Sequence, residues 1–204
     1  MTGGRAAAAA AGLLGLTLAL GVAGLAAAAR PAAAQPAPER VKTIPDVEVR
    51  DQDGRGWRFS RDLLSGRTAV ISFIYTTCTA SCPLVGQVFG ELQAALAAAG
   101  RDDVVLLSLT RDPETDTPER LKRWGQRFGA RPGWLLLSGD KAAMDELLLA
   151  LTGDPARRGP HSDAVLIVDL DQGIWRRESA AGPPGYYLDI LDQIRPSATR
   201  PRHQ

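Results

Sequence analysis

Two cysteines, Cys78 and Cys82, are the residues of this 204-residue chain whose type and spacing point most directly to chemistry. The sequence contains only 2 cysteines, too few for a disulfide scaffold. If the intervening residues are helical, the two Cβ atoms lie about 5–6 Å apart on one face. Two sulfurs at that separation can hold one metal ion, and a modest backbone shift can close a disulfide. The spacing permits both chemistries and does not choose between them.

The elements around the cysteines favour thiolates. Residues 69–75 form an apolar, β-branched run that is typical of a strand buried on both faces. A helix is predicted to begin near Ser81, with Pro83 in its first turn, and to stop at Gly100. The thiols therefore lie past the carboxyl end of a buried strand and at a helix N-terminus. Unpaired N–H groups and the helix dipole there stabilise the thiolate, which is the form that attacks disulfides and binds metals.

The rest of the pattern predicts an α/β domain. A hairpin at 47–50 and 57–60 precedes the dithiol, and helices capped by Thr117 and Asp140 separate later strands. Those strands are predicted at 104–109, 134–137, 164–170 and 174–177, the last two antiparallel, before a final helix opened by Pro183-Pro184. Alternating strands and helices predict a mostly parallel central sheet with helices on both faces. A dithiol between the first core strand and its helix makes the fold similar to thioredoxin.

His161 is the candidate third ligand. The chain has 2 histidines, and His203, near the end of the chain, is interpreted as solvated. His161 lies in the polar loop before the 164–170 strand, and in thioredoxin-like folds that loop approaches the dithiol. Two soft sulfurs and an imidazole suit copper, either Cu(I) or Cu(II), whereas a structural zinc site wants four protein ligands. Inert thiols, a stabilising disulfide and a solvated histidine are the alternatives.

Three acidic residues follow the 104–109 strand, namely Asp112, Asp116 and Glu119. They are interpreted as a solvated loop that leads into the capped helix. One of these carboxylates can also reach a bound copper as an outer partner.

The ends of the chain predict export. Residues 6–29 carry no charge, follow Arg5 and precede a run of three alanines at 32–34. Residues 1–34 are therefore predicted to be a signal peptide or an N-terminal membrane anchor, placing the protein in the periplasm, either soluble or anchored to the inner membrane. The remaining divisions are a linker at 35–45, the folded domain at 46–195 and a disordered tail at 196–204. A net charge of +1 gives no electrostatic case for nucleic acid.

Three motifs resemble the Sco/SenC family of copper-binding cytochrome c oxidase assembly proteins. They are FIYTTCTASCP at 73–83, LSLTRDPETDTPERLKRW at 107–124, and His161-Ser162 before AVLIVD. The resemblance extends from about residue 45 to residue 194. It implies a thioredoxin-like fold and one copper ion bound by Cys78, Cys82 and His161.

The resemblance implies a copper chaperone that supports assembly of the binuclear copper centre of the oxidase. The implied partners are cytochrome c oxidase subunit II, a periplasmic copper donor and a thioredoxin-like reductant. The alternative is a thiol-disulfide reductase in which Cys78 is the nucleophile and Cys82 its partner. A third hypothesis, a peroxide-reducing or redox-sensing protein, follows from Thr77-Cys78. A three-ligand copper site needs His161, whereas a reductase does not.

Overall fold

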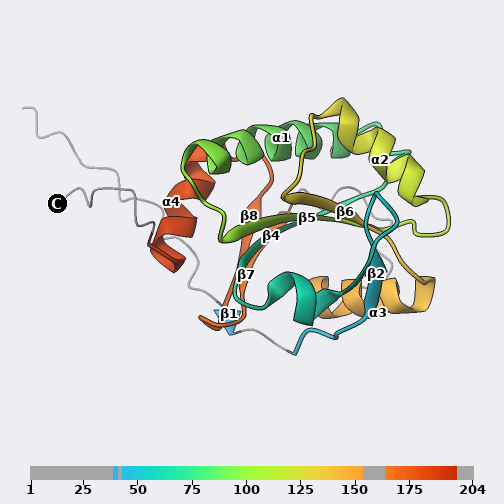
Figure 1. The fold of residues 1–204 in the computed structure, drawn as a ribbon, viewed down its shortest axis with the longest axis horizontal. Coiled ribbons are helices and arrows are strands. Elements are labelled where there is room, and N and C mark those ends of the chain that lie inside the picture. The colour runs from blue at the N-terminus through green and yellow to red at the C-terminus, as the bar shows by residue number, and fades with distance from the viewer. Residues whose placement is uncertain (1–38, 41–42, 154–163, 197–204) are drawn as a thin grey trace, which may run out of the picture. The chain divides into compact units, whose positions relative to one another are not determined.

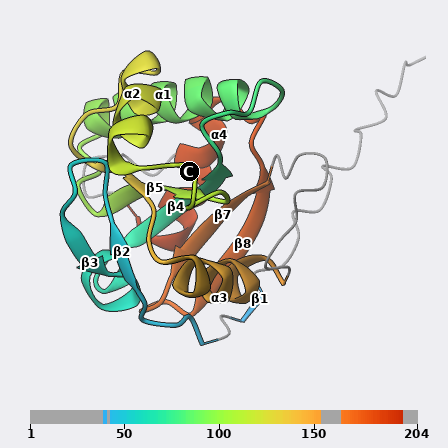
Figure 2. The same cartoon turned by 90° about the vertical axis from the view of Figure 1, so that its right-hand side faces the viewer.

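The computed structural model of the chain describes residues 39–40, 43–153 and 164–196. Its centre is a six-stranded sheet in the order β1-β8-β7-β4-β5-β6. Figure 1 shows α1 and α2 above this sheet and α3 below it, and Figure 2 shows the same layers from the side. The predicted thioredoxin-like α/β fold is confirmed.

The helices and strands have the following bounds. The sheet strands are β1 (Glu39–Arg40), β4 (Thr68–Ile74), β5 (Val104–Thr110), β6 (Trp134–Leu137), β7 (Ala164–Asp169) and β8 (Ile174–Ser179). The helices are α1 (Cys82–Ala98), α2 (Pro118–Arg127), α3 (Lys141–Thr152) and α4 (Pro184–Ile194). A separate hairpin, β2 (Glu48–Arg50) and β3 (Gly56–Arg58), leads into a single π-helical segment, η1 (Phe59–Leu64). The hairpin confirms the predicted N-terminal element.

The sheet is mixed. Strands β4, β5 and β6 are parallel, whereas β7 runs antiparallel to β4, and β8 antiparallel to β7. The parallel part is therefore smaller than the alternation of strands and helices indicates, because hydrophobic patterning does not report the direction in which a strand returns. Within the predicted linker at 35–45, two residues form β1 against β8, and the side chain of Ile44 is buried.

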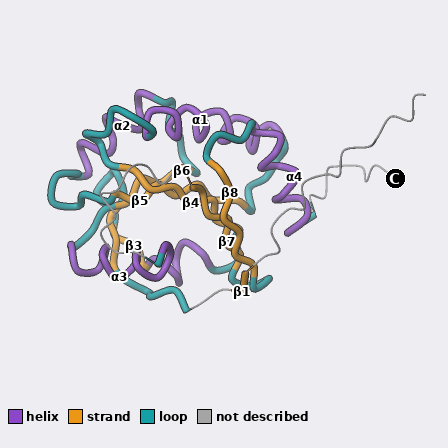
Figure 3. Tube along the Cα trace, turned by 180° about the vertical axis from the view of Figure 1, so that it is seen from behind, coloured by secondary structure: helices purple, strands orange, loops and turns teal. Residues whose placement is uncertain are grey.

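Two apolar cores cover the two faces of the sheet. Figure 3 shows from behind the helices that lie over these faces. Every residue of β4 and β5 is buried, which agrees with the continuous apolar runs in their sequences. One core joins α1, α2 and α4 to the sheet, and the other joins η1, α3 and the hairpin to it. The central strands are thus held from both sides, and β4 delivers its following loop to a fixed position.

The predicted helix caps are confirmed. The side chain of Thr117 accepts a hydrogen bond from the N–H of Arg120 at 3.4 Å. The Asp140 carboxylate accepts from the N–H of Ala142 at 2.9 Å, and Gly153 ends α3 with a φ of 77°. These local signals fix where α2 and α3 begin, and so where the loops at the carboxyl ends of the strands lie.

Helices α1 and α2 approach closely because α1 presents two glycines to α2. A Cβ atom on Gly86 would lie 2.5 Å from the ring of Phe128, and one on Gly90 would collide with the carbonyl oxygen of Phe128. The missing side chains therefore create the groove in which the C-terminal end of α2 rests.

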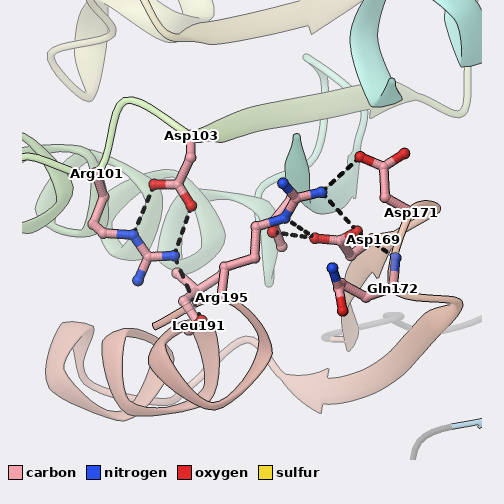
Figure 4. Close-up of polar contacts among 8 residues, drawn as sticks. Arg101, Asp103, Asp169, Asp171, Gln172, Leu191 and Arg195 are labelled. Carbon is pink, nitrogen blue, oxygen red and sulfur yellow. Dashed lines mark hydrogen bonds and ion pairs between the residues drawn. The ribbon is translucent and has the colours of Figure 1, made fainter. Parts of the chain in front are cut away.

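Two arginines fasten the C-terminal helix to the end of the sheet opposite the dithiol (Figure 4). The buried carboxylate of Asp169 accepts hydrogen bonds from Arg195, from the Thr68 hydroxyl at 2.7 Å and from the N–H of Gln172 at 3.0 Å. Burial alone would raise the pKa of Asp169, but these donors outweigh it and hold the pKa below its usual value. The side chain of Arg101 is 3% exposed. It forms ion pairs with Asp103, on the loop before β5, and with Asp192 on α4.

The outer edge of β6 is covered by the turn of the β2-β3 hairpin. The side-chain amide of Gln52 donates to the carbonyl of Trp134 at 3.1 Å and accepts from the N–H of Leu136 at 2.8 Å. The backbone of Arg50 exchanges two hydrogen bonds with that of Ser138, at 2.7 and 2.9 Å. Peptide groups that would otherwise face solvent are therefore paired within the chain.

Candidate metal centre

The two cysteines lie together at the carboxyl end of the parallel strands. Cys78 lies in the loop after β4, and Cys82 is the first residue of α1, with Pro83 following it in the first turn. Both side chains are almost enclosed, at 7% and 4% exposure, and both thiols are free. The structure therefore places the predicted pair at the predicted strand-to-helix junction, with no bond between the two sulfurs.

The backbone of the loop turns its N–H groups toward the first sulfur. The N–H of Cys82 donates to Sγ of Cys78 at 3.4 Å. The N–H of Cys78 donates to the carbonyl of Tyr75 at 3.1 Å, which closes a tight turn at the end of β4. This arrangement follows from the sequence, because a helix that begins at Cys82 leaves the N–H groups of its first turn without helical acceptors.

The two thiols differ in acidity. Burial raises the pKa of the Cys78 thiol, but hydrogen bonds from the Cys82 thiol, from the N–H groups of Cys82 and Ala80 and from the Tyr75 hydroxyl outweigh it, so the net pKa is lowered. Burial first, and then donation of its proton to Cys78, raise the pKa of Cys82 to about 12. Cys78 is thus the residue that becomes a thiolate, and Cys82 is its hydrogen-bond donor.

A buried aspartate holds the loop that carries Cys78. The side chain of Asp116 is 0% exposed and accepts from the N–H of Thr76 at 3.1 and 3.2 Å. The same carboxylate accepts from the hydroxyls of Thr76 and of Thr110, at the end of β5. Asp116 therefore ties the end of β4, the end of β5 and the start of α2 to one another, and it anchors Thr76, which lies two residues before Cys78.

The sequence prediction of a solvated acidic loop is wrong for Asp116. Asp112 is half-buried and Glu119 is exposed, but Asp116 is enclosed and accepts hydrogen bonds from Thr76, 40 residues away in sequence, and from Thr110, six residues away. Tyr75 was also missed as a site residue, since in sequence it reads only as the last residue of an apolar strand. The one local hint for Asp116 is its position immediately before the capped start of α2.

The third predicted ligand, His161, lies outside the described residues. Across residues 39–40, 43–153 and 164–196, no group of three histidine, cysteine, aspartate or glutamate side chains is placed to hold a metal ion. The structure thus brings together two of the three predicted ligands. A pair of sulfurs, one of them favoured as a thiolate, suits a soft ion such as Cu(I), which two ligands can satisfy.

The fold and the site define a class of protein: a thioredoxin-like α/β domain with a buried dithiol between its first core strand and the following helix. The SCO1/SenC family model matches residues 38–174. The chain belongs to the SCO1/SenC family.

Three known proteins illustrate the similarity. The chain is 32% identical over 112 residues to a putative copper-binding protein of Stutzerimonas stutzeri, covering 55% of this chain and 53% of that one. The chain thus spans about half the length of the curated relatives it matches.

Two solved structures share the fold. One is BsSco, described as a member of the Sco family of cytochrome c oxidase assembly proteins with a disulfide switch. It has a TM-score of 0.65 and 23% identity, covering 82% of this chain and 99% of that one. Copper-bound ScoI of Bradyrhizobium japonicum has a TM-score of 0.57 and 24% identity, covering 74% of this chain and 99% of that one.

No helix within the described residues combines the length and the apolar character needed to cross a membrane. The predicted export segment, residues 1–34, lies outside that part of the chain.

Proposed function

We propose that this protein is a copper chaperone that binds one copper ion through Cys78, Cys82 and His161. The observation that carries the proposal is the enclosed pair of free thiols, in which Cys78 is favoured as a thiolate and Cys82 opens the following helix. A thiolate that is already hydrogen-bonded and desolvated binds a soft cation without rearranging the loop. Membership of the SCO1/SenC family and the copper-bound relative support copper as the ion.

In this proposal the protein receives copper from a periplasmic donor and delivers it to the binuclear copper centre of cytochrome c oxidase subunit II. Residues 1–34 act as a signal peptide or as an anchor in the inner membrane, so the domain works in the periplasm. The description of BsSco as an oxidase assembly protein supports this assignment. Both Cu(I) and Cu(II) are cargo, and His161 matters more for Cu(II), which prefers more ligands and a nitrogen donor.

Copper titration of the purified full chain under reducing conditions tests the proposal. We expect one copper per chain, loss of tight binding in Cys78→Ser and in Cys82→Ser, and retained Cu(I) binding in His161→Ala. Loss of the Cu(II)–thiolate absorption band is expected in His161→Ala. Stoichiometric copper in the double cysteine variant would refute the site.

A thiol-disulfide reductase is the second candidate, and the unequal acidity of the two cysteines favours it. The Cys78 thiolate would attack a partner's disulfide, releasing one partner thiolate and forming a mixed disulfide. Cys82, on losing its proton, would then displace the second partner sulfur, leaving a protein disulfide and a reduced partner. A thioredoxin-like reductant would restore the dithiol.

Oxidase assembly in cells that carry only His161→Ala separates the two functions. A copper carrier should lose oxidase activity nearly as far as the cysteine variants do. Full oxidase activity in His161→Ala, together with failure of Cys78→Ser, would establish the reductase instead.

A further inference from the structure

Helix α2 presents three arginines along one face. Arg120, Arg123 and Arg127 are spaced three and four residues apart, which places them on the same side of a helix. Arg123 and Arg127 are exposed, and Arg120 is half-buried. These three residues are called the α2 arginine face below, and they span about 10 Å along the helix axis.

The α2 arginine face lines a surface concavity that reaches the dithiol loop. The concavity has a volume of about 640 Å³, and its other lining residues are Thr76, Trp124 and Gln126. Thr76 precedes Cys78 by two positions and is held in place by Asp116. One end of this basic hollow is therefore formed by the segment that carries Cys78.

The charge of the α2 arginine face is not neutralised within the described part of the chain. Lys122, on the neighbouring side of α2, forms an ion pair with Asp53 at 2.8 Å. By contrast, no carboxylate among residues 43–153 and 164–196 forms an ion pair with any of the three arginines. The pKa of the exposed Glu119, which is next to Arg120 in sequence, is lowered first by a hydrogen bond with Thr117 and also by the charge of Arg123.

We propose that the α2 arginine face is a docking surface for an acidic protein segment that lies beside the cysteines of a partner. The proposal rests on the proposed function in one respect, that the partner exchanges copper or a disulfide with Cys78 and Cys82. Guanidinium groups match carboxylates in geometry as well as charge. A row of three arginines, in a hollow that ends at Thr76, two residues before Cys78, orients an acidic segment so that adjoining thiols can approach Cys78. A protein segment is favoured because the positive charge extends along a helix rather than converging on one point, as it would around a small anion.

Ion pairs between exposed side chains mainly increase the rate of association, and salt screens them. Three such ion pairs together predict that an acidic segment binds with a Kd about tenfold lower than a neutral segment at low ionic strength. The same preference should shrink as salt approaches physiological concentration and above.

The test uses the full chain in neutral detergent and two fluorescein-labelled decapeptides without cysteine, one with four glutamates and one with four glutamines in their place. Fluorescence anisotropy measures the Kd of each peptide at low and high salt. Two protein variants are compared: the triple arginine-to-glutamine variant of the α2 arginine face, and a control that makes the same charge change at Arg61, Arg67 and Arg177. The control residues are exposed and lie outside α2 and the dithiol loop.

We expect the wild type and the control to bind the acidic peptide about tenfold more tightly than the neutral one, and the α2 variant to lose that preference. An equal Kd for both peptides in the wild type, or a preference kept by the α2 variant, would overturn the proposal.

A second readout places the bound segment beside the dithiol. The same peptides are given a pair of cysteines joined by a disulfide, and the rate at which the reduced, metal-free protein reduces them is measured. In this exchange the peptide S–S bond breaks and a protein S–S bond forms, and the two thiol hydrogens of the protein end on the peptide. Faster reduction of the acidic peptide in the wild type, lost in the α2 variant, is expected, and equal rates would refute docking beside the cysteines.

Copper stoichiometry separates this inference from the proposed function. The α2 variant retains both cysteines and should still bind one copper. If the wild type binds no copper but prefers the acidic peptide, the proposed chaperone function is refuted and the proposed docking surface is retained.

Discussion

Replacing Asp116 by alanine should destabilise the protein and loosen the dithiol loop. The substitution removes the acceptor of three donors: the N–H of Thr76 and the hydroxyls of Thr76 and Thr110. Hydrogen bonds to a charged acceptor contribute about 1.5–3 kcal/mol each. The two hydroxyls can rotate toward other acceptors, but the N–H of Thr76 has a fixed direction and would lose its acceptor in a half-buried position. We therefore expect the free energy of unfolding to fall by about 3–5 kcal/mol.

Asp116→Asn gives the conservative comparison. Its amide oxygen can still accept from the N–H of Thr76 and its amide nitrogen can donate to a threonine hydroxyl, so a loss of about 1–3 kcal/mol is expected. Asp102→Ala is the matched control, because Asp102 is exposed and should change stability by less than about 0.5 kcal/mol.

Urea unfolding followed by tryptophan fluorescence measures these changes in stability. A separate measurement, the pH dependence of alkylation of the reduced protein, reports whether the loop still lowers the pKa of Cys78. If Asp116 positions the loop, the alkylation midpoint of Cys78 should rise toward that of a free thiol in Asp116→Ala. A stability change below 1 kcal/mol, or an unchanged alkylation midpoint, would refute this account of Asp116.

Three further predictions follow from the described residues. At pH 7 the reduced, metal-free protein should react with iodoacetamide first at Cys78, because its pKa is lowered while that of Cys82 is raised to about 12; peptide mass spectrometry identifies the site, and equal labelling would contradict the assignment. The pKa of Asp169 is lower in the folded than in the unfolded chain, so its contribution to stability is complete above about pH 4 and is lost as the pH falls further. Urea midpoints between pH 7 and pH 3 should therefore fall more steeply in the wild type than in Asp169→Asn. If the midpoints of both proteins fall in parallel with pH, Asp169 does not contribute in this way. Thermal melts should show that Gly90→Ala destabilises the protein by about 1–3 kcal/mol through its clash with α2, while Gly185→Ala, whose Cβ would meet nothing within 4 Å, stabilises it by about 0.5–1 kcal/mol; the opposite order would show that the clash is relieved.

Local signals in the sequence were sufficient for the elements that position the dithiol. The apolar run of β4, the proline after Cys82 and the caps at Thr117 and Asp140 each act within a few residues, so they can be recognised without the fold. The thiolate character of Cys78 also follows from its place before a helix, although its dependence on Tyr75 does not.

Contacts between segments that are distant in the chain could not be predicted from the sequence. Asp116 looks like an ordinary loop aspartate until the ends of β4 and β5 bring Thr76 and Thr110 against it. The antiparallel return of β7 is similarly invisible, because a buried strand has the same composition in either direction. The role of His161 stays a prediction.

The pairing of Gln52 with β6 has a consequence for how other proteins can recognise this domain. One side-chain amide takes the place of a neighbouring strand, at a position where an open edge would accept any extended polypeptide by backbone pairing. Backbone pairing is indifferent to sequence, so an open edge would admit unfolded or misdirected chains as readily as the intended one. With that edge closed by Gln52 and by the backbone of Arg50, an extended chain cannot pair with β6, and recognition of a partner depends on side chains.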